Sequence, residues 1–423
     1  MIAKFKITYN DFPKNFWIII LSTFIDRLGG SMIFPFFAIF VSTKFGVGMT
    51  QVGILFSIFA LSNVIGSFLG GAMTDRYGRK FMIIFGLVVS AVSSILLALV
   101  PEFEQFAWVS AITGLLSNTG GPARQAMMAD VLPKEKRVEG FGIMRVVINL
   151  AVALGPMIGG LLATTALSYL LLFILDAITS IITAVIVYFK LPETKPEPQK
   201  AIGSEEPPVE GIMDTFKGYF KVGNDKPFIA FVLIGALVNI VYFQMYSSLP
   251  FFMHNIKEMS AQSYGYILSM NAFMFVFLQF WFTKKIKTYP SMLVMAAGAV
   301  FYMVGFTMFG FVGGLALFAL AMAIITIGEM LISPVAQAMI VQFAPEDMRG
   351  RYMAVFGLSF MLPNIFGSLV AGLVMDNFNP SWVWWSGGMI TFVAVMGYLA
   401  LHFRKIERLQ IEQTPATAVP SES

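Results

Sequence analysis

The sequence of 423 residues contains no cysteine and two histidines, and charged residues make up 12% of it. Without cysteine the chain has no disulfide, no thiolate metal site and no cysteine nucleophile. His254 and His402 lie at the ends of two different apolar segments, so no histidine metal cluster is expected. The phosphate-binding pattern G-x-x-x-x-G-K-[ST] is missing as well, which excludes an ATPase of that type. We therefore expect no cofactor, no metal and no enzyme active site.

Apolar residues make up 57% of the chain. Soluble domains carry about twice this chain's share of charged residues, roughly a quarter of the sequence. Uncharged apolar runs of about twenty residues recur along the chain, and each is long enough to cross a hydrocarbon core of about 30 Å. These patterns predict an all-α membrane protein, because a helix satisfies its backbone polar groups within the segment.

Reading the apolar windows against their charged or Pro/Gly-rich flanks predicts twelve membrane-spanning helices. The first is expected to be a retained anchor, since no A-x-A cleavage signal follows it. The predicted spans are 16–41, 50–73, 81–100, 107–128, 140–162, 169–189, 228–252, 263–282, 290–311, 315–340, 352–375 and 382–403.

The Lys and Arg residues are distributed very unevenly between the two sides of these spans. With twelve spans both termini lie on one side, and 23 of the 28 Lys and Arg residues fall there, against Lys44 and Lys257 on the other. Under the positive-inside rule this side is cytoplasmic. The sequence therefore predicts a multi-pass protein of the plasma membrane with both termini in the cytoplasm.

The chain is predicted to have four parts. Residues 1–189 form one six-helix bundle, 190–227 a Pro-rich cytoplasmic linker, 228–405 a second six-helix bundle, and 406–423 a disordered tail. In the linker Ile212, Phe216 and Phe220 recur at helical spacing, which indicates a short amphipathic helix on the membrane surface. A plain disordered tether is the alternative for this segment.

The two predicted bundles share an internal repeat. At an offset of 212 residues, Pro122 meets Pro334 and Arg137 meets Arg349, and two glycine pairs fall in the same register. Shared topology in both halves is typical of transporters that place their site between the halves at mid-membrane and rock them to alternate access.

The loop between the second and third spans reads GAMTDRYGRK. We expect Gly71 to let the helix end pack closely, and Gly78 to permit a tight turn. The loop resembles the signature G-x-L-A-D-R-x-G-R-K of the major facilitator superfamily, with Met73 and Thr74 in place of Leu and Ala. The resemblance implies the twelve-helix, two-bundle fold of that superfamily and a gate motif at the following positions: Gly71, Asp75, Arg76, Gly78, Arg79 and Lys80.

The fifth span carries a second pattern, Asn149-x5-Gly155-Pro156-x2-Gly159-Gly160. It resembles the antiporter motif of the drug:proton antiporter branch of that superfamily, although Ala151 replaces the first glycine of G-x-x-x-G-P. The resemblance implies proton-coupled export. Small-residue packing against a neighbouring helix is the alternative role of these glycines.

Ionisable side chains inside the membrane are costly, so each is a candidate for function. At about 1.5 Å per residue, Asp26, Arg27 and Glu329 lie near mid-membrane. We predict that Glu329 couples protons or recognises substrate; a protonated structural glutamate is the alternative. Since Asp26 and Arg27 point about 100° apart on one helix, two arrangements are open. Either Asp26 faces the cavity and Arg27 makes a structural ion pair, or the reverse holds.

Further candidates come from the ends and the centre of the spans. Asp75, Asp130, Arg137 and Arg145 are predicted to form a cytoplasmic latch, with solvated loop charges as the alternative for Asp75 and Asp130. In the resembled superfamily the first, fourth, seventh and tenth spans line the cavity. The resemblance implies five polar cavity-lining side chains: Asn118, Asn239, Tyr242, Gln244 and Tyr246.

The sequence thus predicts a proton-coupled secondary transporter that exports lipophilic or cationic compounds (multidrug efflux) by alternating access. Its expected partners are a small-molecule substrate, protons and the lipid bilayer, with no nucleic acid, and it is expected to be a monomer. The alternatives are a transporter of one metabolite, such as a sugar, peptide or lipid, and a non-transporting membrane receptor.

Overall fold

The structure is a computed structural model that describes residues 11–162, 166–195, 220–286, 288–345 and 348–404. The predicted tail, 406–423, lies outside the described residues, and so does the predicted amphipathic helix up to residue 219. The described residues form helices and their connections, with no strand among them. The helical elements are α2 (Lys14–Ile33), η1 (Phe34–Phe36), α3 (Phe37–Phe45), α4 (Met49–Tyr77), α5 (Arg79–Leu99), α6 (Phe103–Ser117), α7 (Gly120–Val131), η2 (Lys134–Lys136), α8 (Arg137–Leu162), α9 (Ala166–Lys190), α11 (Lys226–Tyr242), α12 (Gln244–Phe251), η3 (Phe252–Ile256), α13 (Ala261–Ile286), α14 (Ser291–Phe309), α15 (Leu315–Phe343), α16 (Arg349–Asn377) and α17 (Trp382–Phe403).

Eleven helical segments of the described chain are long and apolar enough to cross a membrane. The remaining predicted span, 107–128, is two shorter helices, α6 and α7, that are separated at Asn118 and Thr119. Asn118 Nδ2 donates a hydrogen bond to the backbone oxygen of Asn63 in α4 at 3.0 Å. This contact anchors the interruption, so one predicted span corresponds to two helices.

Two other spans are interrupted at matching positions of the internal repeat. At Pro35 the first span changes from α-helix to the 3₁₀ turn η1, and just after Pro250 the seventh span changes to the π-helical turn η3. Proline lacks the N–H that the helix needs and crowds the preceding turn, so it perturbs a helix where it occurs. Pro35 thus lies within the interruption of the first span, whereas Pro250 lies inside α12 and the π-helical turn follows it.

The chain divides into two compact units. The first comprises Met1–Ala201, Met245–Ala272 and Ser368–Asp376, and the second comprises Ile202–Gln244, Phe273–Gly367 and Asn377–Ser423. How the chain divides into folding bundles stays a prediction.

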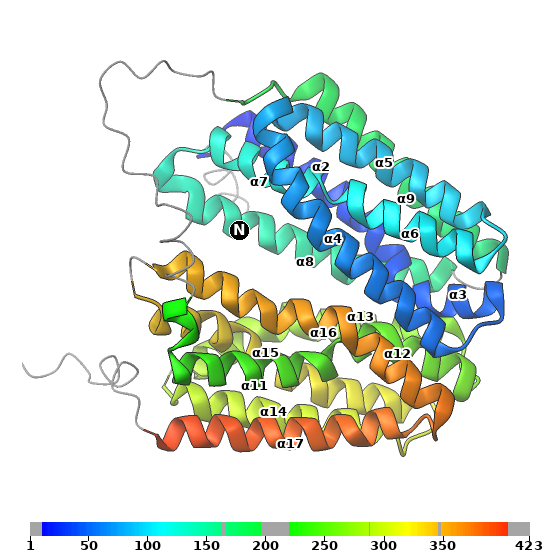
Figure 1. The fold of residues 1–423 in the computed structure, drawn as a ribbon, viewed down its shortest axis with the longest axis vertical. Helices are drawn as coiled ribbons and strands as arrows, with labels where there is room; N and C mark the ends of the chain where they lie inside the picture. The colour runs from blue at the N-terminus through cyan, green and yellow to red at the C-terminus, as the bar shows by residue number, and fades with distance from the viewer. Residues whose placement is uncertain (1–10, 163–165, 196–219, 287, 346–347, 405–423) are drawn as a thin grey trace, which may run out of the picture. The chain divides into compact units, whose positions relative to one another are not determined.

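In the first unit α2 packs along α8 and α9, α5 packs on α9, and α4 packs on α6 (Figure 1). Glycine allows the α4–α6 approach, because a Cβ at Gly114 would lie 2.8 Å from the backbone oxygen of Phe59. Phe16, Met82 and Met127 belong to the fully buried core that these helices enclose. The packing of the unit depends on small residues at the crossings and large apolar residues between them.

In the second unit α14 packs against both α15 and α17, and α11 packs on α17 (Figure 1). Gly298 and Gly328 bring α14 and α15 together, since a Cβ at Gly298 would lie 3.0 Å from the backbone oxygen of Gly328. Phe309 and Trp384 meet edge to face with ring centroids 5.3 Å apart, between α14 and α17. Both side chains are buried.

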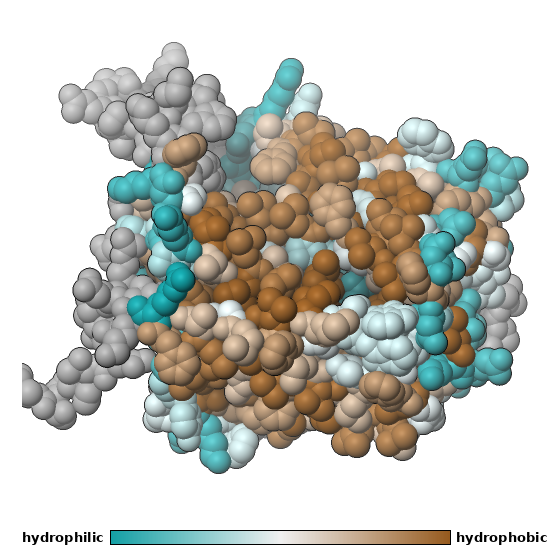
Figure 2. All heavy atoms as spheres, turned by 60° about the horizontal axis from the view of Figure 1, so that its bottom comes forward, coloured by the Kyte–Doolittle hydropathy of each residue, from teal (hydrophilic) through white to brown (hydrophobic). Residues whose placement is uncertain are grey.

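Large apolar side chains are also abundant on the outside of the helices. Phe68, Trp108 and Phe280 are more than 70% exposed. Figure 2 shows apolar residues over most of the visible face and hydrophilic residues toward two of its edges. A soluble protein rarely exposes so much contiguous apolar surface. The surface is therefore that of a protein embedded in lipid.

Candidate functional site

The first unit encloses a cavity of about 450 Å³. Such a volume suits a drug-sized molecule. Aromatic side chains line much of it, together with the amides of Asn63, Asn118 and Asn271. The cavity also holds four ionisable side chains from three helices: Asp26, Arg27, Arg124 and Asp176.

Asp26 and Arg124 form an ion pair in this cavity. Arg124 Nη1 in α7 donates to Asp26 Oδ2 in α2 at 2.9 Å, and the two side chains are 14% and 17% exposed. A charge at mid-membrane costs about 2.5–3.5 kcal/mol on insertion scales, and a partner of opposite charge offsets that cost. Of the two arrangements left open by the sequence, the structure therefore has the one in which Asp26 makes the ion pair.

Arg27 lies on the same helix but has a different environment. Its side chain is exposed and lines the cavity. Among the described residues it has neither an ion pair nor a hydrogen bond, while Asp26 and Arg124 are close enough to act on it electrostatically. Arg27 is thus a guanidinium that faces the cavity.

Asp176 is the acidic group of this cavity that the site prediction left out. It lies in α9, is 7% exposed, and accepts a short hydrogen bond from the Ser94 hydroxyl of α5. A Cβ at Gly29 would lie 2.9 Å from Asp176 Oδ1, so α2 covers this carboxyl closely. An aspartate seven residues into an apolar span was a signal that it could be functional, but no pattern linked it to Ser94.

The second unit contains a smaller cavity of about 150 Å³ around Glu329. The Tyr242 hydroxyl of α11 donates to Glu329 Oε1 of α15 at 2.8 Å. Tyr302 of α14 stacks on Tyr242 with ring planes 9° apart and also lines the cavity. Among the described residues that line this cavity, Glu329 is the acidic one, and none is Lys or Arg. A tyrosine hydroxyl thus contacts the carboxyl group, which is partly buried.

Four of the five side chains predicted as polar cavity contacts line these two cavities. Asn118 and Tyr246 line the first, and Asn239 and Tyr242 line the second. Asn239 Nδ2 also donates to the backbone oxygen of Ser359 at 2.9 Å. Gln244 is buried, donates from Nε2 to the oxygen of Ile240, and lines neither of these two cavities.

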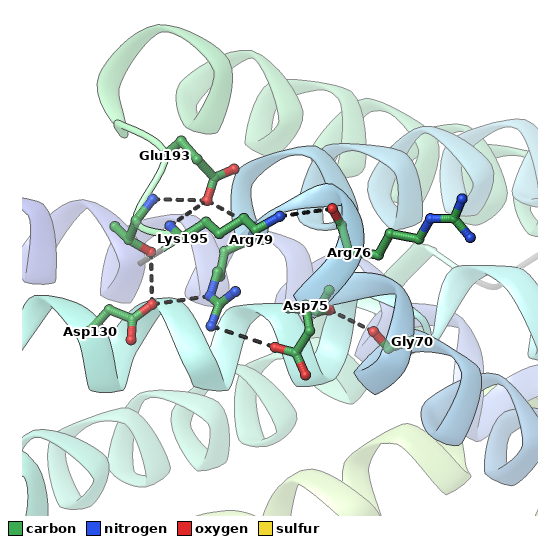
Figure 3. A network of polar contacts seen from close by, with 9 residues as sticks. Gly70, Asp75, Arg76, Arg79, Asp130, Glu193 and Lys195 are labelled. Carbon is green, nitrogen blue, oxygen red and sulfur yellow. Dashed lines mark hydrogen bonds and ion pairs between the residues drawn. The ribbon is translucent and has the colours of Figure 1, made fainter. Parts of the chain in front are cut away.

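A polar network joins the ends of α4, α5, α7 and α9 (Figure 3). Arg79 Nε bonds Asp130 Oδ2 at 3.2 Å, and Arg79 Nη2 lies 3.6 Å from Asp75 Oδ1. Thr194 Oγ1 donates to the same oxygen of Asp130 at 3.1 Å, and Lys195 Nζ donates to the backbone oxygen of Arg76 at 2.9 Å. Arg79 is the centre of this network.

The Glu193 carboxylate accepts hydrogen bonds from the backbone of the turn between α4 and α5. It accepts the backbone N–H groups of Arg79 and Lys80 at 2.9 and 3.0 Å, and those of Thr194 and Lys195. Burial acts to raise the pKa of Glu193, but these four N–H donors outweigh it and hold the pKa below its usual value. The Gly78 backbone has φ +98°, and a Cβ there would lie 2.5 Å from Glu193 Oε2. The tight turn predicted at Gly78 is therefore confirmed.

The residues predicted for the latch are only partly assembled. Asp75 and Asp130 meet at Arg79, whereas Arg137 Nε is buried with no hydrogen-bond partner in the described chain. Arg145 is exposed, and no ion pair joins it to the described residues. Glu193, Thr194 and Lys195 were missed because they follow the sixth span by sequence and reach the α4–α5 turn only in the fold.

The close packing predicted for Gly71 is wrong. A Cβ at Gly71 would meet no atom of the described residues within 4 Å, whereas one at the preceding Gly70 would lie 2.5 Å from the backbone oxygen of Thr119. Two adjacent glycines point to different sides of a helix, and sequence alone does not say which faces the neighbour. Gly70 thus allows α4 to approach the α6–α7 interruption.

The glycines of the fifth span make the close contacts that small residues permit. A Cβ at Gly155 or Gly159 would clash with the backbone of α2, and one at Gly160 would lie 3.1 Å from Gly265 Cα in α13. Pro156 lines the first cavity, and Asn149 is exposed on α8. Packing is therefore one role of this pattern.

The sequence of this chain matches a known protein family. The sequence model of the Major Facilitator Superfamily matches residues 19–334 and 293–421. The chain belongs to this superfamily. Its resemblance to the signature loop and its predicted all-α membrane fold are thereby confirmed, and this superfamily member is a multi-pass membrane transporter.

Two proteins of known name are similar to this chain in sequence. An Na⁺, Li⁺, K⁺/H⁺ antiporter of Planococcus maritimus is 26% identical over 419 residues, which cover 92% of this chain and 94% of the relative. The quinolone resistance protein NorA of Staphylococcus aureus is 30% identical over 150 residues, or 36% of this chain and 38% of NorA. The family has antiporters among its members, at low identity to this transporter.

Solved structures agree in fold. The nucleoside transporter NupG superposes with a TM-score of 0.77 at 15% identity, covering 92% of this chain and all of NupG. A bacterial homologue of the human lysosomal transporter Spinster gives a TM-score of 0.70 at 15% identity, covering 93% of this chain and 96% of that one. At these identities the likeness establishes the fold alone.

Proposed function

We propose that this transporter is a proton-coupled exporter of lipophilic or cationic compounds that works by alternating access. We place it in the plasma membrane as a monomer with both termini in the cytoplasm. The observation that carries the proposal is Glu329, a partly buried carboxyl group held by the Tyr242 hydroxyl in the cavity of the second unit.

Coupling follows from the surroundings of Glu329. In this proposal the Glu329 carboxyl, which lies in a cavity and accepts the Tyr242 hydroxyl, binds a proton when no cationic substrate is present. A cationic substrate favours the ionised form and is disfavoured by the proton. Competition of this kind links the entry of a proton to the release of substrate, which the proton gradient then drives.

The cavity of the first unit supports the binding of a bulky substrate. Its volume of about 450 Å³ and its aromatic walls suit a lipophilic molecule. In this proposal the aromatic side chains contact the substrate, while the Asp26–Arg124 pair holds α2 and α7 in position. The Arg79 network at the helix ends serves as the cytoplasmic latch of the transport cycle.

Exchange of monovalent metal cations for protons is a second candidate. It is favoured by the antiporter of Planococcus maritimus, whose match extends over nearly the whole of both chains. Asp176 and Glu329 each provide a carboxyl group at a cavity wall, which is the ligand type that a hard cation prefers. In this case lipophilic dyes would not be moved.

The test is transport by the purified protein in proteoliposomes with an imposed pH gradient. Ethidium, sugars and lipids are compared with Na⁺, K⁺ and Li⁺ as substrates. We expect outward ethidium flux that stops when the gradient is collapsed. Gradient-driven cation flux without ethidium flux would establish the second candidate, and gradient-independent flux of a single solute would overturn both.

Glu329→Gln separates the coupling residue from the fold. We expect it to lose the pH dependence of ethidium flux, while Glu104→Gln, which changes an exposed acid in the first turn of α6, matches the wild type. Unchanged substrate affinity and pH dependence in Glu329→Gln, for cationic and neutral substrates, would remove Glu329 from the mechanism.

A further inference from the structure

The four ionisable groups of the first cavity are not equally satisfied. Asp26 and Arg124 neutralise each other at 2.9 Å. Asp176 accepts the Ser94 hydroxyl and is 7% exposed. Arg27 is exposed to the cavity and has no ionic or hydrogen-bonding partner in the described chain. The cavity thus presents one guanidinium that no carboxylate of the described residues contacts in an ion pair.

The guanidinium of Arg27 remains charged under all physiological conditions. The nearby carboxylate of Asp26 is already engaged by Arg124, and Arg124 itself adds positive potential at Arg27. A planar guanidinium binds carboxylate, sulfonate or phosphate groups through two parallel N–H···O bonds. The end of the cavity at Arg27 is therefore suited to an anionic group.

The rest of the wall combines aromatic and aliphatic side chains with hydroxyl and amide groups. Phe34 and Phe56 meet edge to face with centroids 6.0 Å apart, and Phe59 and Phe173 also line the cavity. These rings offer faces on which a flat apolar body can pack. An anionic group at Arg27 and an aromatic body against these side chains would fill both parts of the cavity.

We infer that the cavity of the first unit binds amphipathic organic anions, with the anionic group on Arg27 and the aromatic body on the phenylalanine wall. Zwitterions whose anionic end reaches Arg27 belong to the same class. The inference goes beyond the lipophilic and cationic compounds of the proposed function, and it rests on that function only for its role in transport. Binding itself can be measured without transport.

Three fluorescent probes with one aromatic body test the inference: dansylglycine carries a carboxylate, dansylamide is neutral and dansylcadaverine is a cation. Their dissociation constants are measured by fluorescence titration of the purified full chain near neutral pH. We expect dansylglycine to bind about tenfold more tightly than dansylamide. Equal affinities for these two probes in the wild type would overturn the inference, whatever the variants do.

The variants assign the preference to one side chain. Arg27→Gln should bring the two affinities within about twofold of each other, and Arg27→Lys should keep an intermediate preference because it retains a point charge. Lys190→Gln, which removes an exposed cation at the end of α9, should behave as the wild type. Size-exclusion profiles and thermal unfolding confirm that each variant is folded. A preference that survives Arg27→Gln would overturn the assignment.

Two further measurements distinguish an inorganic-anion site from an organic-anion site, and the anion site from the proposed transport function. Titrations in potassium chloride and in potassium gluconate are compared, and loss of the dansylglycine preference in chloride alone would assign Arg27 to inorganic anions and overturn the organic class. Ethidium efflux driven by protons is measured in parallel. Its absence in a wild type that still prefers dansylglycine would overturn the proposed function and leave the anion site standing; the converse would overturn the anion site alone.

Discussion

Both units hold a carboxyl group in a cavity, but different groups satisfy it. In the first unit Asp26 is paired with a guanidinium at 2.9 Å, in a cavity of about 450 Å³ with two arginines in its wall. In the second unit Glu329 accepts a tyrosine hydroxyl at 2.8 Å, in a cavity of about 150 Å³ whose described lining residues include no Lys or Arg.

The difference is one between an ion pair and a hydrogen bond to a hydroxyl group. An ion pair between two helices holds them together, because removing either partner leaves the other charge uncompensated. A carboxyl group that meets a hydroxyl can keep its hydrogen bond in either protonation state, because a hydroxyl donates and accepts. The Asp26–Arg124 pair therefore joins α2 and α7, whereas Asp176 in the first cavity and Glu329 in the second each accept a hydroxyl group.

The largest effect is expected from breaking the ion pair. Asp26→Asn leaves Arg124 charged and mostly buried, and should destabilise the protein by about 3–5 kcal/mol and lower its abundance. Glu329→Gln keeps an acceptor for Tyr242 and should cost less than about 1 kcal/mol. Both are measured by chemical unfolding of purified protein. Equal losses would contradict the distinction, and an Asp26→Asn, Arg124→Gln double variant should recover most of the stability.

The next largest loss of stability is expected when a hydroxyl group that donates to a carboxyl group is removed. Ser94→Ala removes the hydroxyl that donates to Asp176, which is 7% exposed, and should cost about 1–3 kcal/mol because a buried polar group loses its hydrogen bond. Tyr242→Phe should cost about 1 kcal/mol, since Glu329 is only partly buried. The same unfolding assay compares the two variants. A larger loss in Tyr242→Phe would show that Glu329 is the more tightly enclosed acid.

The Arg79 network extends the comparison to ion pairs at the helix ends. The Asp75 side chain is 79% exposed and lies 3.6 Å from Arg79, whereas Asp130 is 25% exposed and accepts from two side chains. We expect Asp130→Asn to lower the rate of ethidium flux more than Asp75→Asn, with stability losses of at most about 1 kcal/mol. Substrate dissociation constants should not change. Equal loss of binding and flux in either variant would argue against a latch.

The smallest effect is a dependence on pH at Glu193. Because its folded pKa is lowered, its contribution to stability is fully present above the usual pKa of glutamate and is lost as the pH falls through the lowered value. The wild type should melt at a higher temperature than Glu193→Gln near about pH 7, and the gap should close toward about pH 3. A gap that widens on acidification would contradict the sign. The effect is small because Glu193 is exposed.

Much of the fold follows from local features of the sequence. Apolar segment length predicted the membrane spans because each helix must cross the same hydrocarbon thickness. The ten residues of the signature-like loop indicated the superfamily, and Gly78 has the positive φ that its turn requires. The division of span 107–128 into α6 and α7 was missed, since polar residues at its centre looked like cavity contacts.

The site depended on contacts between helices. The sequence placed Asp26, Arg27 and Glu329 near mid-membrane, but it gave no partner to any of them. It also favoured Gly71 over Gly70, and it missed Glu193, which reaches the α4–α5 turn across more than a hundred residues of chain.

The sequence by itself determined that this protein lies in a membrane, that it repeats a six-helix pattern and that acids and arginines lie within its spans, because hydropathy and residue spacing act along one helix at a time. Only the tertiary structure decided that Arg124 pairs with Asp26 and that Arg27 faces the cavity. The reason is physical: an ion pair depends on the rotation and depth of two helices relative to each other, and those are set by packing at glycines and aromatic rings far from the charges.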